Sequence, residues 1–339
     1  MTIVIVALSA FLLSMGLTGL ARWIALRSSL VDIPNERSSH TVPTPSGGGV
    51  AIAITVLLLA GVLSVVENMS LPLLLAVSVA GSLVAVIGLL DDYRNVPIVV
   101  RLLVQVASFL LAIYWLEWDP IFRIASALEI GGVPAKALSV LLAVWGLNLF
   151  NFMDGIDGIA ASEASFVAFA GASMSYYLSF ETSLAWALLA SACLGFLVWN
   201  WAPAKIFMGD VGSSFLGFLL VILLARTIQD GSISVWTASI LIAPFVVDAT
   251  VTLLRRAARG EVWYRAHKSH AYQQLARSWG SHARVVIALI VINIAIVLPI
   301  GLLSVWFPAS APLVCIGIYA LLVAGVLTLG AGAESGEPS

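Results

Sequence analysis

Charged residues are scarce in this 339-residue chain. Lys and Arg number 16 and Asp and Glu number 18, which is 10% of the sequence, whereas a soluble domain has roughly 25% charged residues. So few charges cannot cover the surface of a water-soluble globule of this size. The net charge of −2 and the pI of about 6.1 also exclude a nucleic-acid-binding protein, which needs a basic surface.

Cysteine is equally rare. Cys193 and Cys315 lie far apart inside apolar runs, which excludes a disulfide framework and a Cys-x-x-Cys metal site. Arg22 and Arg27 follow the first apolar run instead of preceding it, unlike the charges of a removable signal peptide. Apolar sequence dominates, with 61% hydrophobic residues and a mean hydropathy of +1.06. These properties exclude a disordered chain and predict a polytopic membrane protein.

Apolar runs long enough to span a bilayer recur along the whole chain. A helix that crosses about 30 Å of hydrocarbon needs roughly 20 mostly apolar residues. We therefore predict an all-α polytopic integral membrane protein with about 11 transmembrane helices. It forms a single domain over residues 1–339 that includes a basic cytoplasmic loop at 255–284. The predicted spans are 2–25, 47–66, 71–90, 98–116, 136–152, 159–179, 183–200, 212–229, 234–254, 284–304 and 311–331.

The basic residues predict how the chain is oriented. With eleven spans and the N-terminus outside, only Arg123, Lys136 and Arg226 of the 16 basic residues fall on the outer side. Basic residues concentrate in cytoplasmic loops. We therefore predict a periplasmic N-terminus and a cytoplasmic C-terminus, with most acidic clusters on the cytoplasmic side as well.

Asp91 and Asp92 follow the third predicted span, in the string GLLDDYRNVP. Adjacent carboxylates repel one another, so both stay ionised only with a cation nearby. Mg²⁺ takes one or two carboxylates together with phosphate oxygens and water. The pair predicts a Mg²⁺–diphosphate site at the membrane surface, with helix capping or a solvated loop face as the alternative.

The string NLFNFMDGIDGIA places a polar side chain at every third position. If the backbone is helical there, successive pairs of Asn148, Asn151, Asp154 and Asp157 share one face of the helix. Two amides and two acids supply both donors and acceptors, as a sugar or nucleotide requires. A structural polar patch would rarely need four such side chains where an apolar helix ends.

Two further strings are rich in glycine. FMGDVGSSFLGF places Asp210 just before the eighth predicted span, where free N–H groups suit phosphate and the acid suits Mg²⁺. Capping by Asp210 or Ser213 is the alternative. VPTPSGGGVAI is not a Walker loop because no GK[ST] follows it, and a flexible link into the second span also explains it.

The basic loop at 255–284 brings Arg265, Lys268, His270 and Arg277 together. Ordinary positive-inside charge explains part of this loop, and phosphate or nucleotide recognition is the functional interpretation. Asp248 lies seven residues before the loop, inside a predicted span. An acid within the membrane is functional by default, although a structural pair with a neighbouring Arg is the alternative.

Taken together, these strings resemble the polyprenyl-phosphate N-acetylhexosamine-1-phosphate transferase family. Two departures stand out: Asn95 occupies a place where the family often has Asp or Lys, and only His270 matches its HxHH motif, with Tyr272 and Gln273 in the other places. The resemblance runs in order from about residue 34 to residue 274 through PTPSGGG, DDYRNVP, NLFNFMDGIDG, FMGDVGSSFLG, PFVVDATVTLLRR and HKSHAYQ.

The resemblance implies transfer of an N-acetylamino-sugar 1-phosphate from a UDP-sugar to undecaprenyl phosphate, with release of UMP. It further implies Mg²⁺, with Mn²⁺ as the alternative ion, and a site on the cytoplasmic face of the bacterial inner membrane. HKSHAYQ resembles the branch that initiates lipopolysaccharide O-antigen chains, and a homodimer is left open. The alternative is a transporter of a polyanionic or lipid-linked substrate. A transporter is expected to carry ionisable residues near the middle of the bilayer, and Asp248 and Glu163 are the only deep acids in the predicted spans.

These considerations assign the predicted site residues. The catalytic acids are Asp91, as the candidate base, with Asp92, Asp154 and Asp157. The metal region comprises Asp91, Asp92 and Asp210. The nucleotide-sugar is assigned to Asn148, Asn151, Asp154, Asp157 and His270. Phosphate and lipid binding are assigned to Arg101, Arg265, Lys268, Gly47 and Gly48.

Overall fold

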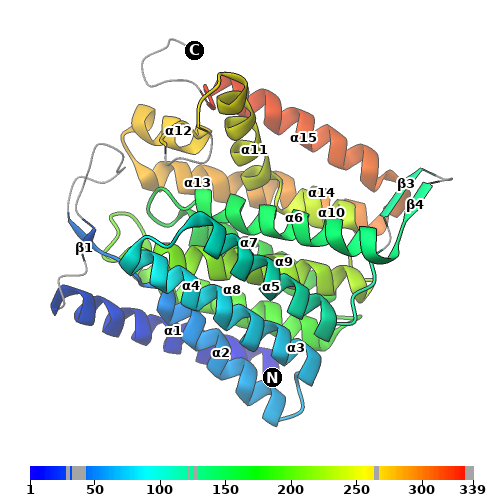
Figure 1. Ribbon diagram of the computed structural model, residues 1–339, viewed down its shortest axis with the longest axis horizontal. Helices are drawn as coiled ribbons and strands as arrows, with labels where there is room; N and C mark the ends of the chain where they lie inside the picture. The colour runs from blue at the N-terminus through cyan, green and yellow to red at the C-terminus, as the bar shows by residue number, and fades with distance from the viewer. Residues whose placement is uncertain (28–30, 33–42, 121, 126–127, 263–266, 333–339) are drawn as a thin grey trace.

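The structure is a computed structural model that describes residues 1–27, 31–32, 43–120, 122–125, 128–262 and 267–332. It is predominantly helical (Figure 1), as predicted for an all-α membrane protein. The first helices are α1 (Thr2–Arg27), α2 (Gly49–Val65), α3 (Leu71–Leu75), α4 (Gly81–Arg94), α5 (Ile98–Trp115), α6 (Gly132–Phe152) and α7 (Ile159–Ser175). The others are α8 (Phe180–Asn200), α9 (Gly209–Gln229), α10 (Val235–Leu241), α11 (Ala243–Ala258), α12 (Ala271–Trp279), α13 (His282–Ile292), α14 (Leu298–Trp306) and α15 (Ala311–Thr328).

Every predicted apolar run coincides with a helical segment. Within the described residues, eight segments are long and apolar enough to cross a membrane, or nine if α10 and α11, which meet at 76°, form one span. The helices α2 and α7 are shorter, with 17 residues each. Turns of π-helix at Ala76–Ala80 and Asn293–Val297 join α3 to α4 and α13 to α14. The multi-pass character is confirmed, while the number of spans and their orientation stay predictions.

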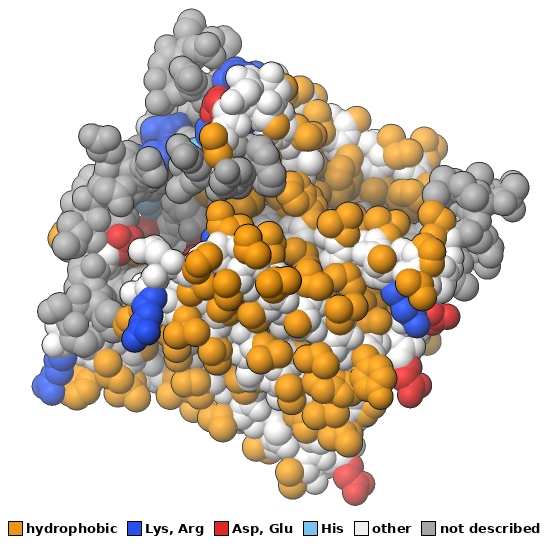
Figure 2. All heavy atoms as spheres, in the orientation of Figure 1, with side chains coloured by type: hydrophobic (Ala, Val, Ile, Leu, Met, Phe, Trp, Pro, Cys, Tyr) orange, Lys and Arg blue, Asp and Glu red, His pale blue; other side chains and the backbone are white. Residues whose placement is uncertain are grey.

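Helices α8 and α9 form the centre of the bundle. In their most apolar stretches, 78% and 83% of residues are buried, against 17% in the segment that contains α15. Apolar side chains cover much of the surface between the two ends of the bundle (Figure 2). The exposed apolar side chains of the described residues include Leu58, Leu110 and Leu141. An apolar surface of this extent suits contact with lipid, because lipid tails take up no polar groups.

The start of α9 is held tightly between α2 and α4. A Cβ on Gly88 of α4 would lie only 2.6 Å from the Asp210 carbonyl oxygen, and a Cβ on Gly49 of α2 would overlap Gly212. The Gly48 and Gly49 N–H groups donate to the carbonyls of residues 207 and 208, at 2.9 and 2.8 Å. The Gly-rich segment is therefore a packed junction, and the flexible link considered for it is wrong.

Two short antiparallel sheets were not predicted. One pairs β1 (Val31–Asp32) with β2 (Thr44–Pro45), and the other pairs β3 (Phe122–Ala125) with β4 (Leu128–Ile130). Strands of two to four residues are too short for alternation of apolar and polar residues to reveal them. Figure 1 places β1 and β3–β4 at opposite ends of the bundle.

Candidate active site

Asp91 and Asp210 share one arginine at the junction of three helices. Asp91 lies near the end of α4, Arg101 in the first turns of α5 and Asp210 at the start of α9. Arg101 Nη1 donates to Asp91 Oδ2 and lies 3.5 Å from Asp210 Oδ2. Asp91 Oδ1 also accepts the Val96 N–H at 2.7 Å, around the left-handed residue Asn95 (φ +48°) that ends α4. Asn tolerates that conformation well, which explains its place in this string.

Asp92 caps the N-terminus of α9. Its Oδ1 accepts the Asp210 N–H at 2.7 Å and its Oδ2 accepts the Val211 N–H at 3.2 Å. The cap satisfies two free backbone donors and places a negative charge at the positive end of the helix. Gly209 (φ +76°) permits the approach, because a Cβ there would lie 2.7 Å from Asp92 Oδ2. The capping alternative is therefore realised at Asp92, and its role in a metal site stays a prediction.

Asn148 and Asn151 lie on the last two turns of α6. The Asn148 amide donates to Gln105 Oε1 of α5 at 2.8 Å, and Asn151 Oδ1 accepts the Ser213 hydroxyl of α9 at 2.8 Å. The helix ends at Phe152, so the helical backbone on which the predicted pairing depended holds for Asn148 and Asn151 and does not extend to Asp154 and Asp157. Gly155 and the left-handed Gly158 (φ +79°) lie in the loop that follows, where a helix does not continue.

Asp154 is the acid of this loop for which the described part of the chain supplies no hydrogen-bond partner. It is partly buried, and neither carboxylate oxygen accepts a hydrogen bond from any described residue. Burial, together with the negative charges of Asp92 and Asp157, raises the pKa of its carboxyl to about 7. Because the charge of Asp92 acts on Asp154, this loop lies near the Asp91–Asp210 region. An acid kept without partners beside other acids is a candidate to bind substrate or to exchange a proton.

Asp157 lines a cavity beside this loop. Its Oδ2 accepts the Ala204 N–H at 3.1 Å and lies 3.3 Å from His282 Nδ1. The cavity has a volume of about 510 Å³, and its lining includes Asp157, Lys268, Gln273, Arg277 and His282. Acid, amide and cation therefore surround one space of the size that small-molecule ligands occupy.

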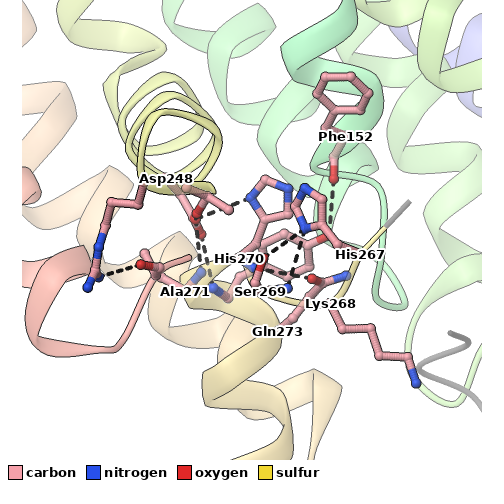
Figure 3. A network of polar contacts seen from close by, with 12 residues as sticks. Phe152, Asp248, His267, Lys268, Ser269, His270, Ala271 and Gln273 are labelled. Carbon is pink, nitrogen blue, oxygen red and sulfur yellow. Dashed lines mark hydrogen bonds and ion pairs between the residues drawn. The ribbon is translucent and has the colours of Figure 1, made fainter. Parts of the chain in front are cut away.

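The HKSHAYQ segment is fixed by the buried acid Asp248 of α11. Asp248 Oδ1 accepts the Ala271 N–H at 2.9 Å and lies 3.4 Å from His270 Nδ1, while its Oδ2 accepts the Tyr272 N–H at 3.0 Å. Asp248 thereby caps α12 and orients the imidazole of His270, as Figure 3 shows. The structural pair with Arg considered for Asp248 is not what the described residues form.

Stacked rings continue the network around His270. The His267 ring lies 4.8 Å from the His270 ring, and the Tyr272 ring lies 5.5 Å from it on the same segment. Burial and the charges of His270 and Arg256 lower the pKa of His267 to about 3, so its imidazole is neutral at physiological pH. Burial, with Asp248 and Asp154 nearby, raises the pKa of Tyr272 well above its usual range.

Tyr272 also joins this segment to the polar loop. Its hydroxyl donates to the Phe152 carbonyl at 3.2 Å, and Gly155 lies so close to it that a Cβ there would overlap the hydroxyl. A Cβ on Gly155 would also lie 2.8 Å from Gln273 Nε2. The two residues that replace histidines of the family's HxHH motif therefore pack against the loop that holds Asp154.

The residues predicted to bind phosphate are divided. Arg101 lies between two site acids, and Lys268 lines the cavity, with its side chain directed away from the imidazoles in Figure 3. The Gly48 N–H is engaged by the Phe207 carbonyl at 2.9 Å, whereas the Cα of Gly47 faces open space. Arg265 lies outside the described residues.

The predicted metal region fits an ion that the substrate completes. Among the described residues, no group of three or more Asp, Glu, His or Cys side chains gathers closely enough to hold a metal alone. Both oxygens of Asp91 and of Asp92 already accept hydrogen bonds, while the Asp210 side chain is 37% exposed. Mg²⁺ requires only one or two carboxylates when phosphates and water supply the remaining oxygens. Asp210, with Asp92 beside it, suits that coordination.

Several site residues escaped sequence reasoning. Asn200 is buried, accepts the Gly158 N–H at 3.0 Å and donates to the Ile206 carbonyl at 3.0 Å, which fixes the polar loop. Gln105 and His282 contact polar residues 43 and 125 positions away in the sequence. A polar side chain inside an apolar run was the signal available for Asn200 and Gln105.

The fold and this arrangement of acids belong to a membrane transferase. Three stretches of sequence far apart, at 88–101, 148–158 and 207–213, meet at one end of an apolar helix bundle, and HKSHAYQ packs against the second of them. The family model described as glycosyl transferase family 4 matches residues 74–228. The chain belongs to the polyprenyl-phosphate N-acetylhexosamine-1-phosphate transferase family, which confirms the resemblance.

Curated relatives extend the match over nearly the whole chain. Decaprenyl-phosphate N-acetylglucosaminephosphotransferase of Mycobacterium tuberculosis is 30% identical over 96% of this chain and 88% of its own length. The protein of that name from Mycolicibacterium smegmatis is also 30% identical, over 96% and 87%. Undecaprenyl-phosphate alpha-N-acetylglucosaminyl 1-phosphate transferase of Escherichia coli K12 is 30% identical over 88% and 82%.

Proposed function

We propose that this protein transfers an N-acetylamino-sugar 1-phosphate from a UDP-sugar to undecaprenyl phosphate and releases UMP. The observation that supports it most directly is the meeting of Asp91, Asp92, Asp210 and Arg101 with the unpartnered Asp154 at one end of the bundle. Family membership supports a sugar-phosphate transfer to a polyprenyl phosphate. The finer assignments, to UDP and to the undecaprenyl carrier, are part of the proposal.

The reaction exchanges one phosphoanhydride for another. A phosphate monoester has a second pKa near 6, so the lipid phosphate is mostly dianionic and nucleophilic at neutral pH. One of its oxygens forms a bond to the sugar-bearing phosphorus of the donor. The bond from that phosphorus to the bridging oxygen breaks, and UMP leaves with the electron pair. Arg101 is the described cation closest to Asp91 and Asp210 and is assigned to the acceptor phosphate.

The donor is assigned to the polar loop and the cavity beside it. Asp157, Lys268 and Gln273 line the cavity, and His270, directed by Asp248, lies in the adjoining segment. Amide, acid and cationic groups together match a nucleotide-sugar, which offers hydroxyls, a base and a diphosphate. Asn148 and Asn151 connect this loop to α5 and α9.

We include Mg²⁺ in the proposal because the bound ion would neutralise negative charge where the lipid phosphate meets the diphosphate of the donor. Asp210 would hold it, beside Asp92, whose two oxygens cap α9. Asp91, whose oxygens engage Val96 and Arg101, acts instead as an orienting acid for that arginine. Asp154 is the side chain with free lone pairs for a substrate proton or hydroxyl.

The orientation and pathway complete the proposal. We place the site on the cytoplasmic face of the bacterial inner membrane, where UDP-sugars are made and where basic residues concentrate. The product starts a lipid-linked surface polysaccharide. The O-antigen assignment depends on the HKSHAYQ string alone.

A reconstitution assay tests this function. Purified full-length protein with undecaprenyl phosphate and a panel of UDP-N-acetylamino sugars should release UMP, and omission of the lipid phosphate should abolish release. Mg²⁺ chelation should stop the reaction. Uptake of a UDP-sugar into proteoliposomes without UMP release would support a transporter instead.

A second measurement separates direct attack from a covalent phosphosugar–Asp intermediate. Protein stripped of lipid phosphate is incubated with labelled UMP and UDP-sugar. Direct attack by the lipid phosphate forbids exchange of label into UDP-sugar, whereas a covalent route permits it. We expect no exchange, since the acceptor is already nucleophilic.

A further inference from the structure

After α15 the chain turns back toward the HKSHAYQ segment. The Gly330 N–H donates to the Leu327 carbonyl at 3.1 Å and the Ala331 N–H donates to the Val326 carbonyl at 3.0 Å, with Gly330 at φ +76°. This pair of bonds is a Schellman motif, which ends a helix and redirects the chain. Ala331 is fully buried. We call residues 330–332 the C-terminal hook.

The hook binds the end of α11 and the turn before α12. Arg255 Nη1 donates to the Ala331 carbonyl at 2.5 Å, and Arg259 Nη1 donates to the Gly332 carbonyl at 2.7 Å. The Gly332 N–H donates to the Ser269 carbonyl at 2.7 Å. In Figure 1 the red end of α15 lies beside the last turns of α11. Three hydrogen bonds thus connect the hook to the end of α11 and to Ser269, the residue before His270.

The last of these bonds fixes the peptide group that precedes His270. Its carbonyl, from Ser269, accepts the Gly332 N–H, and its N–H, from His270, donates to Gln273 Oε1 at 3.3 Å. The His270 imidazole is 2% exposed and lies 3.4 Å from Asp248. Because both ends of the peptide group are bonded, its plane, and with it the direction of the His270 side chain, is determined.

Only glycine fits at the tip of the hook. Gly332 has φ +74°, a conformation that L side chains rarely adopt. A Cβ there would lie 2.9 Å from the Cβ of Arg255 and 3.2 Å from the Thr252 carbonyl oxygen. A side chain there would strain the backbone and force the hook or α11 to shift, which we expect to weaken the bond to Ser269.

We propose that the C-terminal hook is a positioning element of the nucleotide-sugar site, acting through the Ser269–His270 peptide group. The hook itself contacts no substrate in this scheme. The inference rests on the proposed function, in which His270 serves the nucleotide-sugar. Loss of the hook therefore weakens use of the donor and leaves use of the lipid acceptor intact, since Arg101 and Asp91 have no contact with it.

Matched truncations test this inference. One variant ends after Leu329 and lacks the hook, and its control ends after Gly332 and keeps it. A full-length pair consists of Gly332→Val and the control Gly325→Val, whose Cβ meets no atom within 4 Å. The variants without a bound hook should raise the KM for the UDP-sugar by about tenfold while the KM for undecaprenyl phosphate stays within about twofold. Both controls should match the wild type.

Hydrogen exchange of residues 267–279 supplies a readout independent of turnover. We expect faster exchange at the His270 amide in the two hook variants than in their controls. Unchanged exchange, an unchanged donor KM, or an equal rise in both KM values would overturn the positioning role. If the wild type releases no UMP, the proposed function fails, and hydrogen exchange alone then decides whether the hook orders the segment.

Discussion

At both ends of the bundle two acids gather around one arginine, and at one end the described residues leave a further, partly buried acid, Asp154, without a hydrogen bond. At the far end, Arg226 lies 3.8 Å from Glu181 and 3.2 Å from Asp230. The Thr182 hydroxyl donates to the second oxygen of Asp230 at 2.5 Å, and the Ser70 N–H donates to the second oxygen of Glu181 at 2.5 Å. Every carboxylate oxygen of this far-end cluster has a partner, which is the pattern of a structural ion pair.

At the site end an arginine also joins two acids, but a third acid lies nearby. Arg101 joins Asp91 and Asp210 as Arg226 joins its two acids. Asp154, close enough for the charge of Asp92 to raise its pKa, accepts no hydrogen bond from the described residues. An acid that lacks hydrogen-bond partners and lies beside other charges lowers the stability of the fold. Proteins keep such residues where a ligand binds to them. The contrast separates a structural cluster from a functional one built of the same residue types.

The largest expected effect follows from replacing the unpartnered acid. Asp154→Asn retains shape and hydrogen-bonding capacity but removes the charge and the exchangeable proton. We expect a loss of about 10³-fold or more in the rate of UMP release, the equivalent of roughly 4 kcal/mol of transition-state stabilisation. The measurement is kcat for the purified variant, with its yield and elution profile compared to the wild type.

The matched control is Asp230→Asn in the far-end cluster. It removes one carboxylate from an otherwise similar arrangement of Arg and two acids. Its rate should stay within about twofold of the wild type, while its thermal midpoint falls, since the partners of Asp230 lose a charge-assisted bond. Equal losses of activity in the two variants would show that the contrast between the ends has no functional meaning.

Asp92 allows helix capping and catalysis to be separated. In Asp92→Asn, one amide oxygen still accepts a backbone N–H, so half of the cap on α9 remains. We expect stability to fall by about 1 kcal/mol, as for a weakened cap, and activity to fall by about 10²-fold because an acid beside the diphosphate is lost. A fall in stability with full activity would make Asp92 a cap alone and remove it from the catalytic set.

The pKa of Asp154 predicts a pH dependence. With that pKa near 7, the carboxylate is protonated at lower pH, so kcat/KM should decline by up to tenfold per pH unit below about 7. The contribution of Asp154 to the free energy of unfolding changes with pH in the opposite direction to kcat/KM. A raised pKa stabilises the protonated fold at low pH, and this contribution is lost as pH rises through 7. Asp154→Asn should therefore be more thermostable than the wild type at pH 8 and similar to it at pH 4.

Sequence reasoning could predict most of the fold, because runs of about 20 apolar residues have few alternatives in a membrane protein. It did not predict the 76° bend between α10 and α11, although Pro244 stands in the first turn of α11. Nor could it predict the π-helical turns, which have no periodic signal. Each of these features depends on packing against neighbours.

The site was predictable as a set of residues and not as a set of contacts. Asp91, Asp154 and Asp210 were recognisable because acids beside apolar helices are rare. The bond from Asp92 to the Asp210 N–H joins residues 118 positions apart, and no local pattern encodes that distance. The capping role of Asp248 escaped notice for the same reason, since α12 begins 23 residues later.

The smallest expected effect comes from the far-end ion pair itself. Glu181→Gln removes the charge that faces Arg226 but leaves an oxygen that can still accept the Ser70 N–H. The pair is partly exposed, at 23% for each side chain, and its atoms are 3.8 Å apart, so we expect a loss of no more than about 1 kcal/mol in stability. That corresponds to a fall of roughly 2–4 °C in thermal midpoint, with UMP release unchanged. Because Glu181 and the candidate site lie at opposite ends of the bundle, a tenfold loss of activity in Glu181→Gln would mean that the two ends are coupled and that the far-end cluster is more than structural.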